Sequence, residues 1–350
     1  MDIPEFRKQA HQMVDWMADY LENIEAYPVK SQVKPKDVYD QIPQDPPEKP
    51  ETMNDIFEDF KEIIIPGITH WQSPNFFAYF PANSSYPSIL GEMLTATLAA
   101  QCMKWETSPA ATELEEKMMH WLKQLIGLPD FFEGVIQDSA SSSTLAAIIA
   151  ARESISGFNV NSKGFEENNL RIYCSSETHS SVDKAVKIAG IGHENLIKIE
   201  VDQAFRLKPD QLEKAIVKDI NNGNIPICVI ATIGTTSSTA VDPVKDIAGI
   251  CRKHNCWLHV DAAYAGSAMV LHDYRWMMEG IEYADSFVFN PHKWMFTNFD
   301  CSAFFVKDKD LLVKSFQLIP EYLKSDLDKQ VNNFSDWGVQ LGRRFRALKL

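Results

Sequence analysis

Cysteine is scarce in this sequence: there are six copies among 350 residues, and they are scattered along the chain. The two that lie closest together, Cys251 and Cys256, lack the Cys-x-x-Cys spacing that is typical of a metal or redox site. We therefore expect six reduced thiols and no metal site.

Positive charge is also in short supply. Lys and Arg total 34 against 48 Asp and Glu, so the formal net charge is −14. An acidic surface disfavours nucleic acids and anionic membranes as partners, and it fits an enzyme that acts on small molecules.

Long hydrophobic runs are missing as well. No apolar run approaches the ~20 residues that are needed to span a bilayer. The N-terminal residues 1–7 carry charges of both signs, and no apolar segment of a signal peptide follows them. We expect a cytoplasmic protein with no membrane partner.

Hydrophobic residues nevertheless make up 45% of the chain, which is enough for a large core and suggests about two domains. Residues 5–25 have the period of an amphipathic helix, the proline-rich stretch 28–50 should be an extended connector, and 51–65 look helical again. We expect residues 1–85 to form a helical arm. Its apolar stripe packs either on its own domain or on a partner subunit.

Residues 86–350 should form one large α/β domain, because helical and strand patterns alternate from here on. Helices are expected over 88–97, 111–126, 141–154, 181–189, 208–219 and 244–254. Strands are expected over 170–174, 196–201, 226–233, 257–260, 286–290 and 302–306. Their almost wholly apolar character predicts a mostly parallel central sheet with helices on both faces.

Lys293 and Asp261 are the most informative residues. Lys293 follows the apolar run 286–289, and Asp261 ends the strand-like run 257–260. A lysine just past one strand and an aspartate at the end of another meet the needs of pyridoxal 5'-phosphate (PLP) chemistry. The lysine can form an imine with the cofactor aldehyde, and the aspartate can keep the ring nitrogen protonated.

Three further groups should reach the same edge of the sheet, because ligands of open α/β sheets gather at the carboxyl ends of the strands. The serine-rich stretch 139–143 opens a helix and could hold a phosphate, although it also reads as an ordinary helix cap. His179 could stack on a cofactor ring or be an ordinary loop histidine. Thr236 could form a hydrogen bond near the ring oxygen.

In this combination, the chain resembles the group II PLP-dependent amino-acid decarboxylases, and most closely the aromatic-L-amino-acid decarboxylases. The resemblance runs from residue 1 to residue 350. The motifs that carry it include Thr69-His70-Trp71, Phe77-Ala78-Tyr79-Phe80-Pro81, Thr178-His179-Ser180-Ser181, the segment from His259 to Gly266, Asn290-Pro291-His292-Lys293-Trp294 and Leu341-Gly342-Arg343-Arg344-Phe345-Arg346.

The resemblance implies the fold type I architecture of PLP enzymes and a homodimer with active sites at its interface. It implies that Lys293 bonds the cofactor, Asp261 pairs with the ring nitrogen, and His179 and Ala263 lie against the two ring faces. The phosphate would be held by Ala140, Ser141, Asn290 and His292. The substrate side chain, an aromatic ring, would be lined by Trp71, Tyr79, Phe80 and Pro81, with Gln101 and Met103 reaching in from the partner subunit.

Phe334 departs from the family pattern. It stands at the position of the catalytic-loop tyrosine that is expected to donate a proton during decarboxylation, and phenylalanine has no proton to give. In having a phenylalanine at this position, the chain resembles the aldehyde synthases of the same family. Those enzymes consume O2 and release an aldehyde, ammonia and hydrogen peroxide besides CO2. Alternatively, water or His179 supplies the proton and the product is the amine.

The chain also stops at Leu350, where family members continue into a small C-terminal domain that helps to form the site. We expect that this domain is missing here. Three hypotheses follow: a decarboxylase for tyrosine, DOPA, tryptophan or phenylalanine, an aromatic aldehyde synthase, and an inactive homologue that serves only as a dimerisation partner. The acidic side chain of Asp138, beside the expected phosphate loop, should point away from it.

Overall fold

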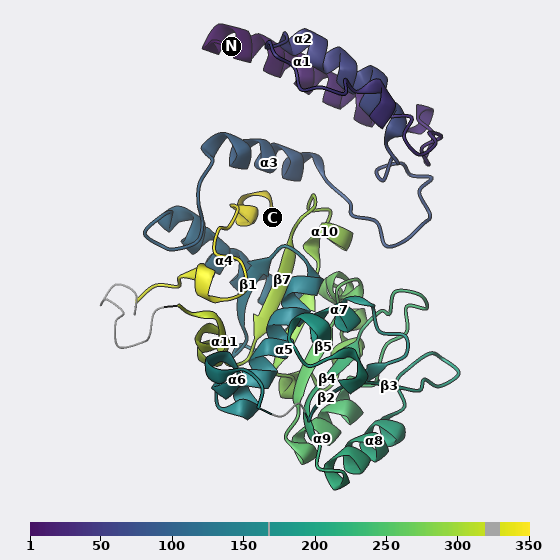
Figure 1. The fold of residues 1–350 in the computed structure, drawn as a ribbon, viewed down its shortest axis with the longest axis vertical. Coiled ribbons are helices and arrows are strands. Elements are labelled where there is room, and N and C mark those ends of the chain that lie inside the picture. Colours follow the sequence, from purple (N-terminus) through teal and green to yellow (C-terminus); the bar gives the residue numbers. More distant parts are fainter. Residues whose placement is uncertain (167–168, 319–329) are drawn as a thin grey trace. The chain divides into compact units, whose positions relative to one another are not determined.

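The computed structural model describes residues 1–166, 169–318 and 330–350, and the chain folds as two compact units, Met1–Pro81 and Ala82–Leu350 (Figure 1). The boundary lies a few residues before the one expected from the sequence, ahead of the first helix of the second unit. The role of the first unit in dimerisation stays a prediction.

The first unit is built from α1 (Ile3–Glu22) and α2 (Met53–Asp59), and α2 continues into the π-helical turn η3 (Phe60–Ile64). The connector between α1 and α2 contains only the short turns η1 (Ile24–Ala26) and η2 (Tyr39–Gln41), and the turn η4 (Ile65–Gly67) follows η3. Trp16 of α1 packs edge-on against Phe57 and Phe60 with ring centroids 5.9 and 5.1 Å away. Phe6 and Val14, on the apolar stripe of α1, stay exposed.

The second unit contains a seven-stranded sheet in the order β1-β7-β6-β5-β4-β2-β3. The strands are β1 (Glu133–Gln137), β2 (Leu170–Ser175), β3 (Leu196–Ile199), β4 (Ile225–Thr232), β5 (Trp257–Asp261), β6 (Ser286–Phe289) and β7 (Ser302–Val306). β7 runs antiparallel to both of its neighbours, whereas the other neighbouring pairs are parallel. The expected mostly parallel sheet is confirmed. β1 was not expected, because its only fully apolar residues are Val135 and Ile136.

The helices of this unit are α3 (Tyr86–Leu98), α4 (Pro109–Ile126), α5 (Ala140–Ser156), α6 (Asn159–Lys163), α7 (Ser181–Ile188), α8 (Pro209–Asn221), α9 (Val244–His254), α10 (Pro291–Trp294) and α11 (Lys309–Phe316). The six expected helices begin and end close to the expected residues, and the short helices α6, α10 and α11 were not expected. Short 3-10 turns include η5 (His193–Asn195), η6 (Ala265–Val270), η7 (His272–Met278), η8 (Ile281–Tyr283), η10 (Phe334–Asp336) and η11 (Arg346–Lys349).

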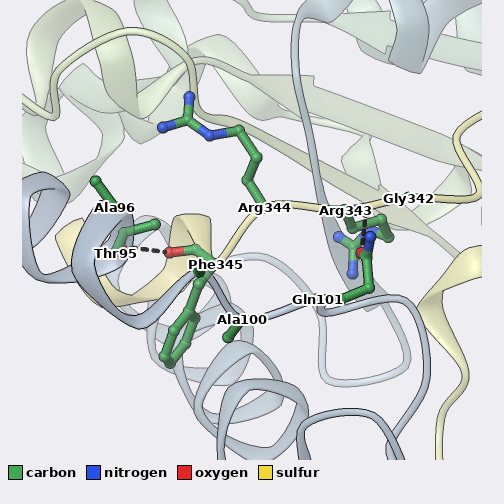
Figure 2. Close-up of a pocket in the computed structure, with 9 residues that line it drawn as sticks. Thr95, Ala96, Ala100, Gln101, Gly342, Arg343, Arg344 and Phe345 are labelled. Carbon is green, nitrogen blue, oxygen red and sulfur yellow. Dashed lines mark hydrogen bonds between the residues drawn. The ribbon is translucent and has the colours of Figure 1, made fainter.

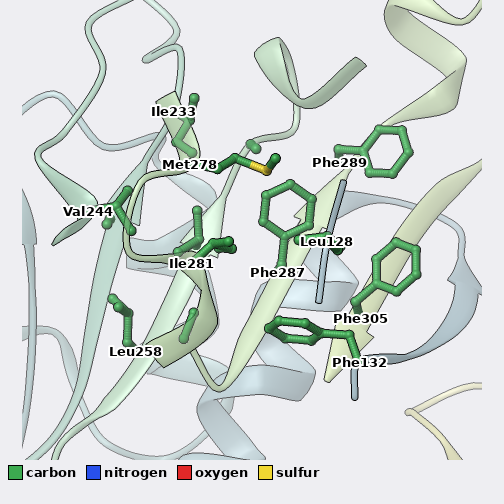
Figure 3. Close-up of a cluster of buried hydrophobic side chains, with 14 of the residues drawn as sticks. Leu128, Phe132, Ile233, Val244, Leu258, Met278, Ile281, Phe287, Phe289 and Phe305 are labelled. Carbon is green, nitrogen blue, oxygen red and sulfur yellow. The ribbon is translucent and has the colours of Figure 1, made fainter. Parts of the chain in front are cut away.

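The sheet has a hydrophobic core on each face, because successive strand side chains point to opposite sides. Leu258 and Val260 of β5 belong to the core that includes side chains of α4, α8 and α9, and Figure 3 shows its aromatic part around Phe287, Phe289 and Phe305. Trp257 belongs to the opposite core, with side chains of α5 and α7. All six cysteines are free and buried. In the part of the chain that the structure describes, no helix is long and apolar enough to cross a membrane.

Candidate active site

The expected site residues follow strands whose carboxyl ends lie at one edge of the sheet. β2, β4, β5 and β6 are parallel neighbours. β1 has the same direction as β6, because β7 is antiparallel to both. The segments that follow these strands therefore start at the same edge, where open α/β sheets bind their ligands.

Asp261 is the last residue of β5, and its side chain is buried. Its Oδ1 accepts a hydrogen bond from the main-chain N–H of Ala263 at 3.0 Å. Burial raises the pKa of Asp261, while the Ala263 N–H and the positive charges of Lys293 and His179 act in the opposite direction. A buried carboxylate of this kind needs a cationic partner, which a protonated ring nitrogen can supply.

Lys293 lies in the single-turn helix α10, directly after β6 and Asn290. Asn83 holds this turn: its main-chain N–H donates to the carbonyl oxygen of His292 at 3.1 Å, and its Nδ2 donates to that of Lys293 at 3.2 Å. Burial lowers the pKa of Lys293, and the charge of Asp261 partly restores it. A lowered pKa favours the neutral amine, which is the form that attacks an aldehyde.

His292 is buried beside Lys293 and presents one defined donor. Its Nδ1 accepts a hydrogen bond from the main-chain N–H of Cys301 at 2.9 Å, so the ring proton resides on Nε2. Burial lowers the pKa of His292 to about 4, and the charge of Lys293 acts in the same direction. The ring is therefore neutral near pH 7, with an Nε2–H group available to an acceptor such as a phosphate oxygen.

Asn290 and the first turn of α5 complete a set of groups that suits an anion. Asn290 is buried, and its Oδ1 has no hydrogen-bond partner among the described residues. Because the two ends of a side-chain amide exchange by a flip, this group can also present its NH2 donor. Ser139 caps α5 by accepting the N–H of Ser142 at 3.3 Å. The N–H groups of Ala140 and Ser141 stand in the first turn, where a helix supplies no acceptor of its own.

The carboxylate of Asp138 is held by two side chains. Its Oδ1 accepts a hydrogen bond from the hydroxyl of Ser139 at 3.0 Å, and its Oδ2 accepts one from Nε2 of Gln340. Gln340 lies 202 residues after Asp138 in the sequence, so no local sequence pattern could have identified this contact.

His179 follows β2 and lies exposed at the start of α7. Its Nδ1 accepts the main-chain N–H of Ser181 at 3.1 Å and lies 2.9 Å from the Ser181 hydroxyl. In the neutral ring, the proton is therefore on Nε2. Thr236 is exposed in the turn after β4, and Ala263 is half-buried after β5.

Phe334 lies in a core environment. Its side chain is 2% exposed, its ring packs edge-on against Trp337 at 5.5 Å, and the guanidinium of Arg343 lies 4.9 Å from its centroid. Of the two residues expected to act from the partner subunit, Gln101 accepts the N–H of Arg343 at 2.7 Å, and the carbonyl of Met103 accepts the N–H of Ser335 at 2.8 Å. The structure thus joins the segment around Gln101 to the segment around Phe334.

A cavity of about 350 Å3 lies beside Gln101, as Figure 2 shows. Its walls include Thr95 of α3, Arg344 and Phe345, and the hydroxyl of Thr95 donates to the carbonyl of Phe345 at 3.3 Å. Among the described residues, the lining of this cavity includes Gln101 but neither Lys293 nor Asp261.

The four expected substrate-pocket residues Trp71, Tyr79, Phe80 and Pro81 belong to the first unit. The ring of Trp71 stacks on Phe76 at 4.7 Å and on Tyr79 at 5.8 Å. Both Trp71 and Tyr79 are exposed, so flat apolar surface is available there. Their place around a substrate stays a prediction.

This chain is similar to one protein family and to several known proteins. The profile described as the pyridoxal-dependent decarboxylase conserved domain matches residues 35–350. A tyrosine decarboxylase of Papaver somniferum is 44% identical over 365 residues, which cover 100% of this chain and 70% of that relative. A phenylacetaldehyde synthase of Arabidopsis thaliana is 45% identical over 360 residues, which cover 100% of this chain and 73% of that relative. The crystal structure of Catharanthus roseus tryptophan decarboxylase in complex with L-tryptophan matches with a TM-score of 0.93 and 43% identity, covering 100% of this chain and 74% of that one.

Proposed function

Because this chain belongs to the pyridoxal-dependent decarboxylase family, we propose that it removes the carboxyl group of an aromatic L-amino acid and releases the aryl amine and CO2. The chain has the fold type I architecture of PLP enzymes, and its cofactor is PLP. The proposed substrates are tyrosine, DOPA, tryptophan and phenylalanine.

The observation that carries the proposal is the position of the buried Asp261 and the half-buried Lys293. Asp261 ends β5 and Lys293 follows β6, the parallel neighbour of β5, at the carboxyl edge of the sheet, and the charge of each favours the charged form of the other. We assign Lys293 as the amine that bonds the cofactor aldehyde and Asp261 as the partner of its ring nitrogen. His179 and Ala263 would lie against the ring, and Thr236 near its oxygen.

The phosphate would be held by donors that the chain already presents. These are the N–H groups of Ala140 and Ser141 at the start of α5, Nε2–H of His292 and the side-chain amide of Asn290. Donors from a helix N-terminus and a neutral histidine fit a dianionic group without requiring a further lysine or arginine.

PLP, when bound, draws electrons from the bond to the departing carboxylate through its protonated ring nitrogen. Asp261 keeps that proton in place, because a buried carboxylate stabilises a cation beside it. His179 would act through Nε2, because the main-chain N–H of Ser181 occupies its Nδ1, and the exposed ring could take up a proton from solvent and pass it to the reacting carbon. Such a proton source would allow an amine product despite the phenylalanine at position 334.

The aromatic class of substrate is supported by two kinds of observation. Trp71 and Tyr79 expose stacked rings, and aromatic rings prefer such surfaces. The names of the relatives point the same way: a tyrosine decarboxylase, a phenylacetaldehyde synthase and a tryptophan decarboxylase that binds L-tryptophan.

A second candidate function is aromatic aldehyde synthesis, and Phe334 favours it. In this reaction the amino acid, O2 and water are converted into the aldehyde, CO2, ammonia and hydrogen peroxide. A side chain without an acidic proton at position 334 cannot protonate the substrate carbon, which leaves that carbon open to oxidation by O2. The similarity to a phenylacetaldehyde synthase also supports this second candidate function.

We also propose a homodimer in which residues 1–85 serve as the dimerisation arm and Gln101 and Met103 reach the partner's site. The exposed apolar residues Phe6 and Val14 of α1 support this arrangement. Sedimentation at several protein concentrations tests it, and a monomer at all concentrations would refute it.

The function is tested by supplying PLP and each aromatic L-amino acid and measuring CO2. Release of CO2 by the parent, and its loss in Lys293→Ala, is the expected result. A chain that gains the absorbance band of bound PLP but releases no CO2 from any aromatic amino acid would contradict the proposal. It would favour the third hypothesis, an inactive dimerisation partner.

A further inference from the structure

His259 is a fully buried histidine that the proposed chemistry does not use. It lies in β5 two residues before Asp261, so both side chains point to the same face of the sheet. The helix α5, whose first turn carries the proposed phosphate donors, packs on β5 and β6 at this face (Figure 1). A buried polar ring between these elements needs a partner for each nitrogen.

The donor and the acceptor of each hydrogen bond around His259 can be assigned. The indole N–H of Trp257 can only donate, and it donates to Oγ of Ser286 at 2.8 Å. The hydroxyl hydrogen of Ser286 then finds its acceptor in Nδ1 of His259, also at 2.8 Å. The ring proton consequently sits on Nε2, which faces Oγ1 of Thr144 at 3.3 Å. This assignment gives each of these hydrogens a partner.

The relay formed by Trp257, Ser286, His259 and Thr144 connects the elements that carry the proposed cofactor contacts. Thr144 lies in α5, one turn after Ala140 and Ser141. Trp257 and His259 lie in β5, which ends at Asp261. Ser286 begins β6, which leads to Asn290 and Lys293.

The relay is uncharged. Burial lowers the pKa of His259 to about 3, so the ring stays neutral at the pH at which cells work. A neutral ring donates through one nitrogen and accepts through the other, whereas a charged ring would donate through both and lose the bond from Ser286. The direction of the relay therefore does not change with moderate shifts in pH.

We propose that His259 is a positioning residue for the cofactor: through Thr144 it fixes the phosphate-binding end of α5 at a set distance from Asp261 at the end of β5. This inference rests on the cofactor contacts assigned under the proposed function. The phosphate and the ring nitrogen belong to one small molecule, whose covalent frame limits the distance between them, so their two binding groups must keep a matching spacing to be satisfied together.

The experiment compares the binding of PLP with that of pyridoxal, which has the same ring and no phosphate. Thr144→Val removes the acceptor of the His259 N–H and keeps the shape of the side chain, and Thr144→Ser restores the hydroxyl. We expect Thr144→Val to weaken PLP binding about tenfold while pyridoxal binding changes by less than about twofold. Thr144→Ser should bind both ligands as the parent does.

A second pair of variants tests the ring itself. His259→Gln can place an amide N–H near Thr144, whereas His259→Leu cannot, so the preference for PLP over pyridoxal should be retained in the first and lost in the second. The phosphorus NMR resonance of bound PLP should move in His259→Leu and Thr144→Val but not in Thr144→Ser. A general loss of folding would weaken both ligands alike.

The proposal is overturned if Thr144→Val retains the parent's ratio of PLP to pyridoxal affinity and its phosphorus resonance. It is also overturned if PLP and pyridoxal affinity fall together in every variant, because His259 would then support only the fold. Neither readout depends on turnover, so failure of the proposed substrate or product would leave this test intact.

Discussion

Cys301 donates its main-chain N–H to Nδ1 of His292 across 2.9 Å, and this single bond decides which nitrogen of the ring carries the proton. Cys301 directly precedes β7, which runs antiparallel to β6. The start of β7 therefore lies beside the turn that follows β6, where the Cys301 N–H sets the tautomer of His292. Because the donor is main chain, the tautomer does not require the thiol.

Acid should destabilise the chain through His292. Burial lowers its pKa to about 4 in the folded state, against about 6.5 in the unfolded chain. Above pH 6.5 the ring is neutral in both states, and its contribution is fully present. As the pH falls toward 4, only the unfolded state takes up the proton, so stability is lost. Between pH 7 and pH 5 we expect His292 to account for a loss of about 2 kcal/mol.

Chemical denaturation of the cofactor-free parent and of His292→Gln at these two pH values measures this effect. Glutamine does not titrate, so the variant should lose less unfolding free energy than the parent over the same interval, while the other titrating groups affect both proteins alike. Equal losses in the two proteins would show that His292 does not have a lowered pKa.

Asparagine at position 261 should give a more stable and much less active protein. Burial raises the pKa of Asp261, which means that the interior disfavours its charge. Asp261→Asn removes that charge at nearly constant shape, and we expect the cofactor-free protein to gain about 1 kcal/mol. CO2 release should fall at least about 100-fold, since the ring nitrogen loses its counter-charge.

The exposed Asp246 of α9 offers a matched control, because Asp246→Asn makes the same chemical change at a residue with no proposed contact to the cofactor or substrate. It should leave both stability and CO2 release near those of the parent. Parent-like activity in Asp261→Asn would remove Asp261 from the site.

Glu115 and Arg343 form a buried ion pair that joins α4 to the C-terminal segment. Their side chains are each 3% exposed, and Nη2 of Arg343 lies 2.7 Å from Oε1 of Glu115. Glu115 also accepts the N–H of Ile136 at 2.8 Å, and Arg343 donates to the carbonyl of the same residue at 2.7 Å. Removing one partner leaves a buried charge, so Glu115→Leu or Arg343→Leu should each cost about 3–5 kcal/mol.

The double variant Glu115→Leu with Arg343→Leu should lose less than the sum of the two single variants, because no lone charge is left behind. Denaturation of all four proteins gives the coupling. The exposed pair of Lys253 and Glu213 supplies a control in which little change is expected. Additive losses at Glu115 and Arg343 would contradict the account of this pair.

The sequence predicted those helices and strands whose hydrophobic pattern extends over a long segment. The apolar pattern over 111–126 predicted a helix that the structure has as α4, and the apolar run at 226–233 predicted β4. β1 and the short helices α6, α10 and α11 were missed, because segments of this length are too short to establish a period. Tertiary pairing with β7, rather than local pattern, makes β1 a strand.

The site was predictable where a residue type stands at a strand end, as with Asp261 and Lys293. The groups that orient them were not. Asn83 contacts Lys293 across 210 residues of sequence, and the N–H of Cys301 is main chain and leaves no mark on residue type. Ser181 was visible beside His179, but only the folded turn shows that its N–H occupies Nδ1.

The measurement that tests the account most directly is simultaneous detection of amine and hydrogen peroxide. The purified protein would be incubated in air with PLP and each aromatic L-amino acid, and the reaction repeated with Phe334→Tyr. The proposed function predicts amine without peroxide in the parent, with a proton source other than residue 334. Aldehyde and peroxide from the parent, replaced by amine in Phe334→Tyr, would contradict it and make the chain an aldehyde synthase.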